Sequence, residues 1–176
     1  MKDSGITLVE LLIVVSIIGL LVIALGFSYE GWMGNYRLES QTKKLYFDLA
    51  DARSRAISRN RIHWAVLDTQ QYTIFEDTNE NGTLDATPPD TQVLPRTPGT
   101  QKRYEYGFDL GVIGAAALPQ TITFDTKGLM TWVPAVNEME FRFVNTRDPD
   151  FDCIVIETSR MWMGEYDPDT VVCERR

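Results

Sequence analysis

Residues 1–27 of the chain read MKDSGITLVELLIVVSIIGLLVIALGF, and the seventeen residues from Leu11 to Phe27 carry no charged side chain. The longer segment from Ile6 to Phe27 has 22 residues and a single charge, Glu10. A membrane-spanning helix needs roughly 20 mostly apolar residues, because each residue adds about 1.5 Å across a hydrocarbon core about 30 Å thick. The segment is therefore long enough to span a membrane once.

Three interpretations of this apolar segment compete. An ordinary secretory signal would have a basic start and a cleavage site of small residues, and Ala24-Leu25-Gly26 resembles such a site. That interpretation gives a secreted β-domain protein released after Gly26, but the apolar run is long for it and Glu10 stands where basic residues belong. A plain membrane anchor leaves Glu10 unexplained, because a charge inside the bilayer is costly unless it has a partner.

The third interpretation uses the whole N-terminus. Residues 5–10, GITLVE, followed by the apolar run, closely resemble the type IV prepilin signal of type IV pilins and type II secretion pseudopilins. The resemblance implies that a prepilin peptidase and methyltransferase cuts between Gly5 and Ile6 and methylates the new amine of Ile6. Glu10 is then the fifth residue of the mature chain, where the family carries its Glu. Ile6 departs from the usual Phe but keeps an apolar side chain at that position.

The same resemblance implies a role for Glu10. In this family the apolar helix stays in the inner membrane until assembly and then packs against other pilin or pseudopilin subunits in a filament core. Glu10 would pair there with the free amine of a neighbouring subunit. Buried ion pairs add little net stability but penalise a wrong register, so we interpret Glu10 as a residue that sets subunit register. A carboxylate near a helix N-terminus is also mildly favourable without any partner.

An amphipathic pattern follows the apolar segment. Trp32 and Tyr36 are typical of a membrane interface, and nearby glycines allow either a bend or a continuous helix. From Asn35 to Arg59 the residues of one helical stripe recur at spacings of three and four. These residues are Leu38, Thr42, Leu45, Leu49, Ala52 and Ala56. We expect a long helix whose second half packs on a folded head.

Beyond residue 61 the apolar period changes to two, which predicts antiparallel strands. We expect strands over residues 62–67, 72–75, 102–108, 120–124, 129–133, 138–144, 153–157 and 160–163. Residues 82–99 are expected to form a Pro/Thr-rich loop, and Glu138 and Glu140 are interpreted as a solvated strand edge. The fold class is α+β: a long N-terminal helix, membrane-spanning in its first half and amphipathic in its second, packed on a C-terminal antiparallel β domain.

The chain carries, in order, DARSRAISRNR at residues 51–61, a predicted strand pair, DTNENG at 77–82, ITFDTKGL at 122–129 and a late pair of cysteines. This order resembles that of the GspH/FimT-like minor pilins and pseudopilins. It implies a leader peptide at residues 1–5, a hydrophobic helix at 6–28, an amphipathic helix at 29–61 and a β head at 62–176. It further implies a minor subunit of a type IV pilus or type II secretion pseudopilus, at the initiating tip. Before assembly the chain would cross the inner membrane once, with its head in the periplasm.

Two cysteines, Cys153 and Cys173, stand far from the single histidine His63, so a zinc site is not expected. In a chain whose head is outside the cytoplasm the default is a disulfide, which would contribute roughly 3 kcal/mol through loop closure. Two free buried thiols are the alternative.

Residues 77–85, DTNENGTLD, have the spacing of the first part of a calcium loop, with Gly82 at its sixth position. The twelfth position, normally a bidentate Glu, is Pro88, and Asp90 lies two residues beyond. Asn-Gly is also an ordinary turn signal, so we favour a plain turn and expect no resident cofactor. If Ca²⁺ binds, the ligands to test are Asp77, Asn79, Asn81 and Asp85.

The sequence argues against an enzyme, because it has neither a nucleophile motif, a phosphate loop nor a cluster of histidines. The net charge of −8 argues against a chain built mainly to wrap nucleic acid. A local basic patch could still contact DNA phosphates, and some minor pilins of this branch take part in DNA uptake. The candidate residues for DNA are Arg53, Arg55, Arg59 and Arg61; a solvated helix face is the alternative.

Overall fold

The computed structural model describes residues 7–85, 90–105, 109–113, 117–133, 138–144 and 149–176, and gives only the backbone for residues 24–31. The chain divides into two compact units, Met1–Arg37 and Leu38–Arg176. Each unit is described by itself below. One helix, α1 (Leu8–Arg59), contributes residues to both.

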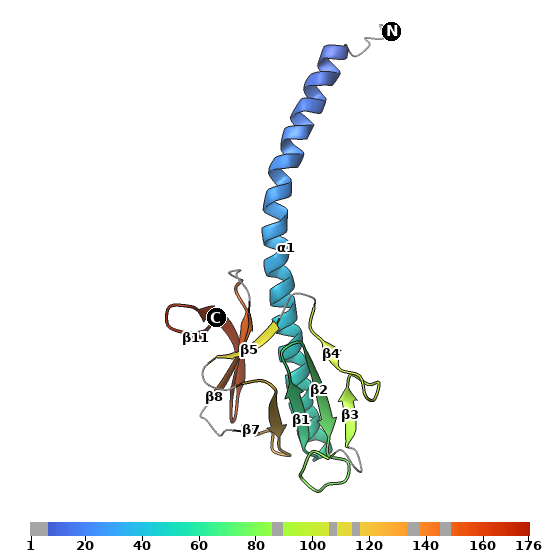
Figure 1. The fold of residues 1–176 in the computed structure, drawn as a ribbon, viewed down its shortest axis with the longest axis vertical. Coiled ribbons are helices and arrows are strands. Elements are labelled where there is room, and N and C mark those ends of the chain that lie inside the picture. The colour runs from blue at the N-terminus through green and yellow to red at the C-terminus, as the bar shows by residue number, and fades with distance from the viewer. Residues whose placement is uncertain (1–6, 86–89, 106–108, 114–116, 134–137, 145–148) are drawn as a thin grey trace. The chain divides into compact units, whose positions relative to one another are not determined.

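Helix α1 begins after Thr7, whose side chain caps it. The backbone N–H of Glu10 donates to Thr7 Oγ1 at 3.3 Å, which satisfies one of the N–H groups that a first turn leaves open. Glu10 in the first turn and Arg59 in the last turn both complement the helix dipole. The backbone is helical through the glycines near residue 30, so the helix is continuous there (Figure 1).

The first unit presents its apolar side chains to its surroundings. Every large apolar side chain from Leu8 to Ile23 is at least 50% exposed, and the rings of Trp32 and Tyr36 stack with centroids 6.1 Å apart. Over the part of the chain that is described, no helix reaches the length and hydropathy needed to cross a membrane.

The second unit holds two antiparallel sheets over the described residues (Figure 1). The strands of the first sheet are, in spatial order, β3 (Thr91–Leu94), β2 (Gln71–Glu76), β1 (His63–Leu67), β6 (Gln120–Phe124) and β7 (Met130–Trp132), with β4 (Lys102–Arg103) paired to β2. The strands of the second are β11 (Val172–Arg175), β10 (Met161–Asp167), β9 (Cys153–Glu157), β8 (Glu138–Val144) and β5 (Asp109–Ile113).

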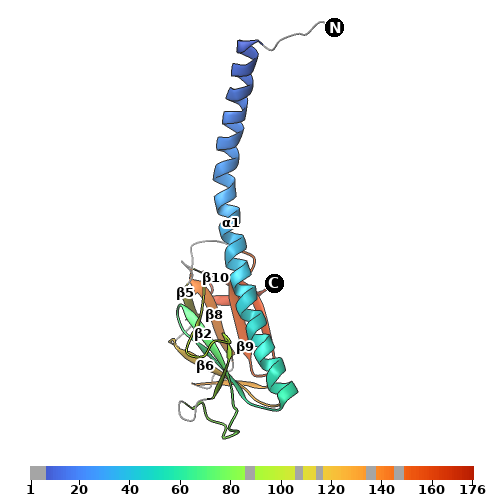
Figure 2. The ribbon, with the colours of Figure 1, turned by 90° about the vertical axis from the view of Figure 1, so that its right-hand side faces the viewer.

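The amphipathic half of α1 packs into a core shared with both sheets. Figure 2 shows this part of the helix, in teal and green, running along the strands. Leu45, Leu49 and Ala56 are completely buried, and they belong to one apolar cluster with Phe124 of β6 and Phe141 of β8. The predicted helical stripe is therefore confirmed as the face that covers the core.

Most of the predicted strands are confirmed, but the structure differs from the prediction in several places. The segment predicted as a loop over residues 82–99 contains β3, and β5 and β11 were not anticipated. Of the strand expected over 102–108, the structure has Lys102–Arg103 as β4, and residues 106–108 lie outside the described part. Strand β8 is not an edge, because it lies between β9 and β5.

The interior position of β8 changes the environment of Glu140. Its Oε2 accepts the backbone N–H of Cys173 at 3.3 Å. Burial raises the pKa of the Glu140 carboxyl above its usual value. Glu138, at the start of the same strand, remains exposed, so the two acids do not form a common solvated edge.

Candidate functional site

The predicted processing site, Gly5 and Ile6, lies outside the described residues. Glu10 is the third residue of α1 and is exposed. Among the ion pairs of the described residues, none includes Glu10. The carboxylate of Glu10 therefore lies in a helical turn whose other side chains are apolar and exposed. The described part of the chain supplies no cation to it.

The apolar side chains from Leu8 to Ile23 form a continuous exposed surface on the first unit, and we call this surface the apolar helix surface. A soluble monomer rarely exposes a contiguous apolar area of this kind, because removing apolar surface from water is favourable. An exposed apolar surface of this extent marks a site for another molecule, either lipid or protein.

Cys153 and Cys173 form the predicted disulfide, with a Cα–Cα distance of 6.0 Å. The bond joins β9 to β11 across β10. It lies in a small apolar cluster, separate from the main core, that also includes Val155. Gly164 of β10 is required at this point, because a Cβ there would lie 2.0 Å from the carbonyl oxygen of Glu174.

Two of the four arginines proposed for DNA binding are held by the surface of the second unit. Arg53 Nη2 donates to the carbonyl oxygen of Ser159 at 2.6 Å. Arg55 Nε donates to Asp51 Oδ2 at 2.7 Å, an i,i+4 ion pair on α1. Both guanidinium groups are already engaged in intramolecular contacts.

The other two arginines converge on one buried acid. Glu76 is 4% exposed, and its Oε2 lies 2.5 Å from Arg59 Nη1 while its Oε1 lies 3.5 Å from Arg61 Nη1. Arg61 also reaches Glu80 Oε1 at 3.2 Å. The four arginines are thus adjacent, as the sequence suggested, but they do not form an uncompensated basic patch.

His63 lies behind this group and is completely buried. Its Nδ1 lies 3.1 Å from the carbonyl oxygen of Arg61, and its Nε2 lies 3.8 Å from Glu76 Oε2. Burial lowers the pKa of His63 below its usual value, so the ring is neutral at pH 7. This arrangement suits a structural histidine, since no solvent or substrate can reach the ring.

The four residues named as possible calcium ligands come together in the loop after β2. Asp77 Oδ2 accepts the backbone N–H of Gly82 at 2.9 Å. Asn79 Nδ2 donates to Asp85 Oδ2 at 3.1 Å, and Asn81 Nδ2 donates to the same oxygen. Within the described residues there is no group of three His, Cys, Asp or Glu side chains placed to hold a metal by themselves.

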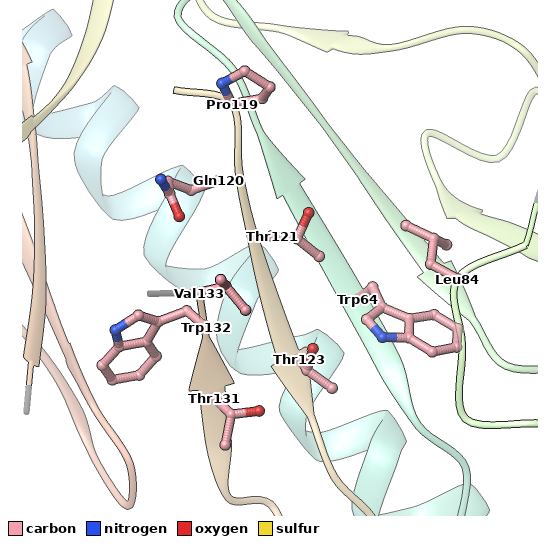
Figure 3. A pocket seen from close by; sticks show the side chains of 9 residues that line it. All are labelled: Trp64, Leu84, Pro119, Gln120, Thr121, Thr123, Thr131, Trp132 and Val133. Atoms are coloured by element: carbon pink, nitrogen blue, oxygen red, sulfur yellow. The ribbon is translucent and has the colours of Figure 1, made fainter. Parts of the chain in front are cut away.

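An open groove of about 580 Å³ lies on the outer face of the first sheet (Figure 3). Thr121 and Thr123 of β6 and Thr131 of β7 contribute to its floor, and Trp64 and Leu84 line one side of it. No sequence pattern had been taken to predict this groove. The alternation of Thr121 and Thr123 with buried Ile122 and Phe124 was the available signal, because it marks the outward face of β6.

Two known families match the chain. The family described as type II transport protein GspH matches residues 41–159, and the prokaryotic N-terminal methylation motif matches residues 1–26. Among solved structures, the chain is similar to the type IV minor pilin FimU of Pseudomonas aeruginosa strain PAO1, with a TM-score of 0.49 and 18% identity over 79% of this chain and 94% of that chain. No curated protein matches the chain.

Proposed function

The chain belongs to the GspH family of type II transport proteins and is a prepilin-type minor pilin or pseudopilin. From this premise we propose that it is assembled through its N-terminal helix into a type IV pilus or type II secretion pseudopilus, at the initiating tip. The apolar helix surface carries the proposal. A row of large side chains, each at least 50% exposed from Leu8 to Ile23, is suited to lipid before assembly and to other subunits afterwards.

In this proposal the peptidase cuts between Gly5 and Ile6, and Glu10 pairs with the methylated amine of a neighbouring subunit. Glu10 has no cation among the described ion pairs of its own chain, and the side chains around it are apolar. An acid left unpaired in a filament core would be costly, so only the stagger that supplies an amine would be stable. Glu10 thereby selects one register.

We place the chain in the inner membrane before assembly, with the second unit in the periplasm. The disulfide between Cys153 and Cys173 supports this compartment, because such bonds persist in oxidising surroundings. The proposed role is structural. His63, the single histidine of the chain, is completely buried, so a substrate cannot reach it as a general base.

Mass spectrometry of the N-terminus, on chain purified from its native envelope, tests the processing step. The expected mature chain begins with methylated Ile6. A chain beginning at Phe27 would instead establish the secreted β-domain protein released by ordinary signal cleavage.

Incorporation into filaments tests the role of Glu10. Glu10→Gln is expected to leave cleavage intact and to reduce incorporation strongly, because the amide cannot neutralise an amine. Asp51→Asn is a matched control, since Asp51 is an exposed acid on the same helix that pairs with Arg55. Equal incorporation of Glu10→Gln and the parent chain would refute the register role.

DNA capture through Arg53, Arg55, Arg59 and Arg61 is the alternative function, and no contact among the described residues favours it. The acids and carbonyls that already bind these arginines would have to be displaced by phosphates. The variant in which all four arginines are replaced by Ala is the comparison. We therefore expect the full parent chain in detergent and this variant to show the same lack of salt-dependent affinity for duplex DNA. DNA capture would be established if the parent chain binds DNA and the variant shows a smaller dependence of log affinity on log salt concentration.

A further inference from the structure

Asp77, the first residue after β2, has a buried oxygen that no group in the described chain satisfies. The residue is 2% exposed, and its Oδ2 accepts the backbone N–H of Gly82, which turns the carboxylate toward the inside of the loop. Its Oδ1 is buried and has no hydrogen-bond partner among the described residues. Burying a carboxylate oxygen without a partner is costly, so this oxygen indicates a missing ligand.

Three other side chains of the same loop contact one another. Asn79 and Asn81 both donate to Asp85 Oδ2, so the side chains at the third, fifth and ninth positions meet at one oxygen. Gly82, at the sixth position, has φ of +76°, the left-handed conformation that a calcium loop needs for its sharp turn. The side chains at the third, fifth and ninth positions of the sequence pattern therefore lie together in the loop.

Asp90 supplies the acid that the twelfth position lacks. It is 6% exposed, and its two oxygens accept the backbone N–H groups of Thr78 at 3.3 Å and of Asp85 at 2.8 Å. These contacts hold its carboxylate against both ends of the loop. Asp90, two residues beyond the twelfth position in the sequence, thus lies against the loop.

The loop gathers negative charge without a neighbouring cation. Among the ion pairs of the described residues none includes Asp77, Asp85 or Asp90. Glu76 and Glu80, which flank Asp77 in sequence, are both paired with arginine. Asp77, Asp85 and Asp90 are therefore acids of one loop that have no ion-pair partner among the described residues, and like charges in one loop repel one another unless a cation binds there.

We propose that this loop, residues 77–85 with Asp90, binds one Ca²⁺ ion through Asp77 Oδ1, the side-chain oxygens of Asn79, Asn81 and Asp85, and Asp90. Carboxylate and amide oxygens are the ligands that Ca²⁺ prefers, and its six to eight flexible positions leave room for backbone oxygens or water. Mg²⁺ demands a smaller, stricter octahedron and binds more weakly at such a loop. The site is independent of filament assembly.

Bound Ca²⁺ would also fix one wall of the groove on the first sheet. Leu84 belongs to the loop and lines the groove beside Trp64 of β1 (Figure 3). The ion, held by residues on both sides of Leu84, restrains the backbone that places this side chain near the indole. Calcium binding is therefore expected to change the fluorescence of Trp64.

Calorimetric titration of the full chain in detergent with CaCl₂ tests the site. We expect one ion per chain, a Kd of about 10⁻⁴ to 10⁻³ M as in extracellular calcium modules, and a raised thermal unfolding midpoint. Asp77→Asn and Asp85→Asn should each weaken binding at least about tenfold, because each removes one anionic ligand. Asp169→Asn, a change at an exposed acid in the turn before β11, should bind like the parent.

The proposal fails if the parent chain shows neither heat nor a midpoint shift at about 10 mM Ca²⁺, well above the expected Kd. It also fails if MgCl₂ gives the same affinity, or if Asp85→Asn and Asn81→Ala bind like the parent. These two positions are not buried, so their variants decide the matter even if Asp77→Asn does not fold. A Ca²⁺-dependent fluorescence change that disappears in Trp64→Phe would support it independently.

Discussion

Removing the disulfide is expected to destabilise the second unit by about 3 kcal/mol. Cys153 and Cys173 are 20 residues apart in the sequence. Closing a loop of about that length lowers the entropy of the unfolded chain by about 11 cal/mol/K, or about 3.3 kcal/mol at 25 °C. The perturbation is the double replacement of Cys153 and Cys173 by Ala, and this loss corresponds to a roughly 250-fold change in the unfolding equilibrium.

The structure indicates that the fold survives this change while β11 is weakened. Val172, Glu174 and Arg175 of this four-residue strand are exposed, and β11 pairs only with β10 among the described strands. The disulfide cluster is separate from the core that α1 covers. The main core should therefore still fold when the bond is absent.

Urea unfolding of the full chain in detergent, followed by tryptophan fluorescence, measures the loss. With a denaturant slope of about 1–3 kcal/mol/M, the midpoint should fall by about 1–3 M. Reduction of the parent chain is the control, because it breaks the same bond without changing side-chain volume, and it should give a similar shift. A midpoint within about 0.3 M of the oxidised parent in both cases would refute the loop-closure reasoning.

Three further changes probe the second unit. Since burial lowers the pKa of His63, the free energy of unfolding should decline as the pH falls below about 6.5, the pKa of histidine in the unfolded chain. Urea unfolding between pH 7.5 and 5 should show a smaller decline for His63→Gln. Gly164→Ala should cost about 1–3 kcal/mol and speed amide exchange in β11, because its Cβ would meet Glu174 O. Leu49→Ala should cost about 2–5 kcal/mol in urea, since Leu49 is completely buried.

The main architecture could be predicted because its elements carry clear periodic patterns. The stripe from Leu38 to Ala56 recurs every three or four residues and became the buried face of α1. Strand β8 alternates along its whole length, and its bounds, Glu138–Val144, are those predicted. The period of the apolar residues shows which side of a helix or strand is buried. Prediction from this period therefore succeeds wherever one side of the element faces a core.

The missed elements lack such a pattern. In β11 only Cys173 is buried, so an edge strand of four residues leaves no alternation of apolar side chains to detect. Strand β3 lies in a segment whose prolines and threonines suggested a loop, and none of its residues is fully buried. The environment of Glu140 was misjudged for another reason: alternation cannot tell an edge strand from an interior one, because the neighbouring strands come from distant sequence.

The position of a charge, more than the number of charges, indicates which partner this chain needs. The arginines from 53 to 61 form a dense basic run in the sequence, but in the fold three of them form ion pairs with Asp51, Glu76 and Glu80, and Arg53 donates to a backbone carbonyl. Glu10 lies among exposed apolar side chains, and Asp77 is buried with an oxygen unsatisfied among the described residues. In both places a carboxylate is costly without a cation, and the chain's described ion pairs supply none. The amine of another subunit and a calcium ion are the cations that these two environments fit, so assembly and metal binding can be tested separately.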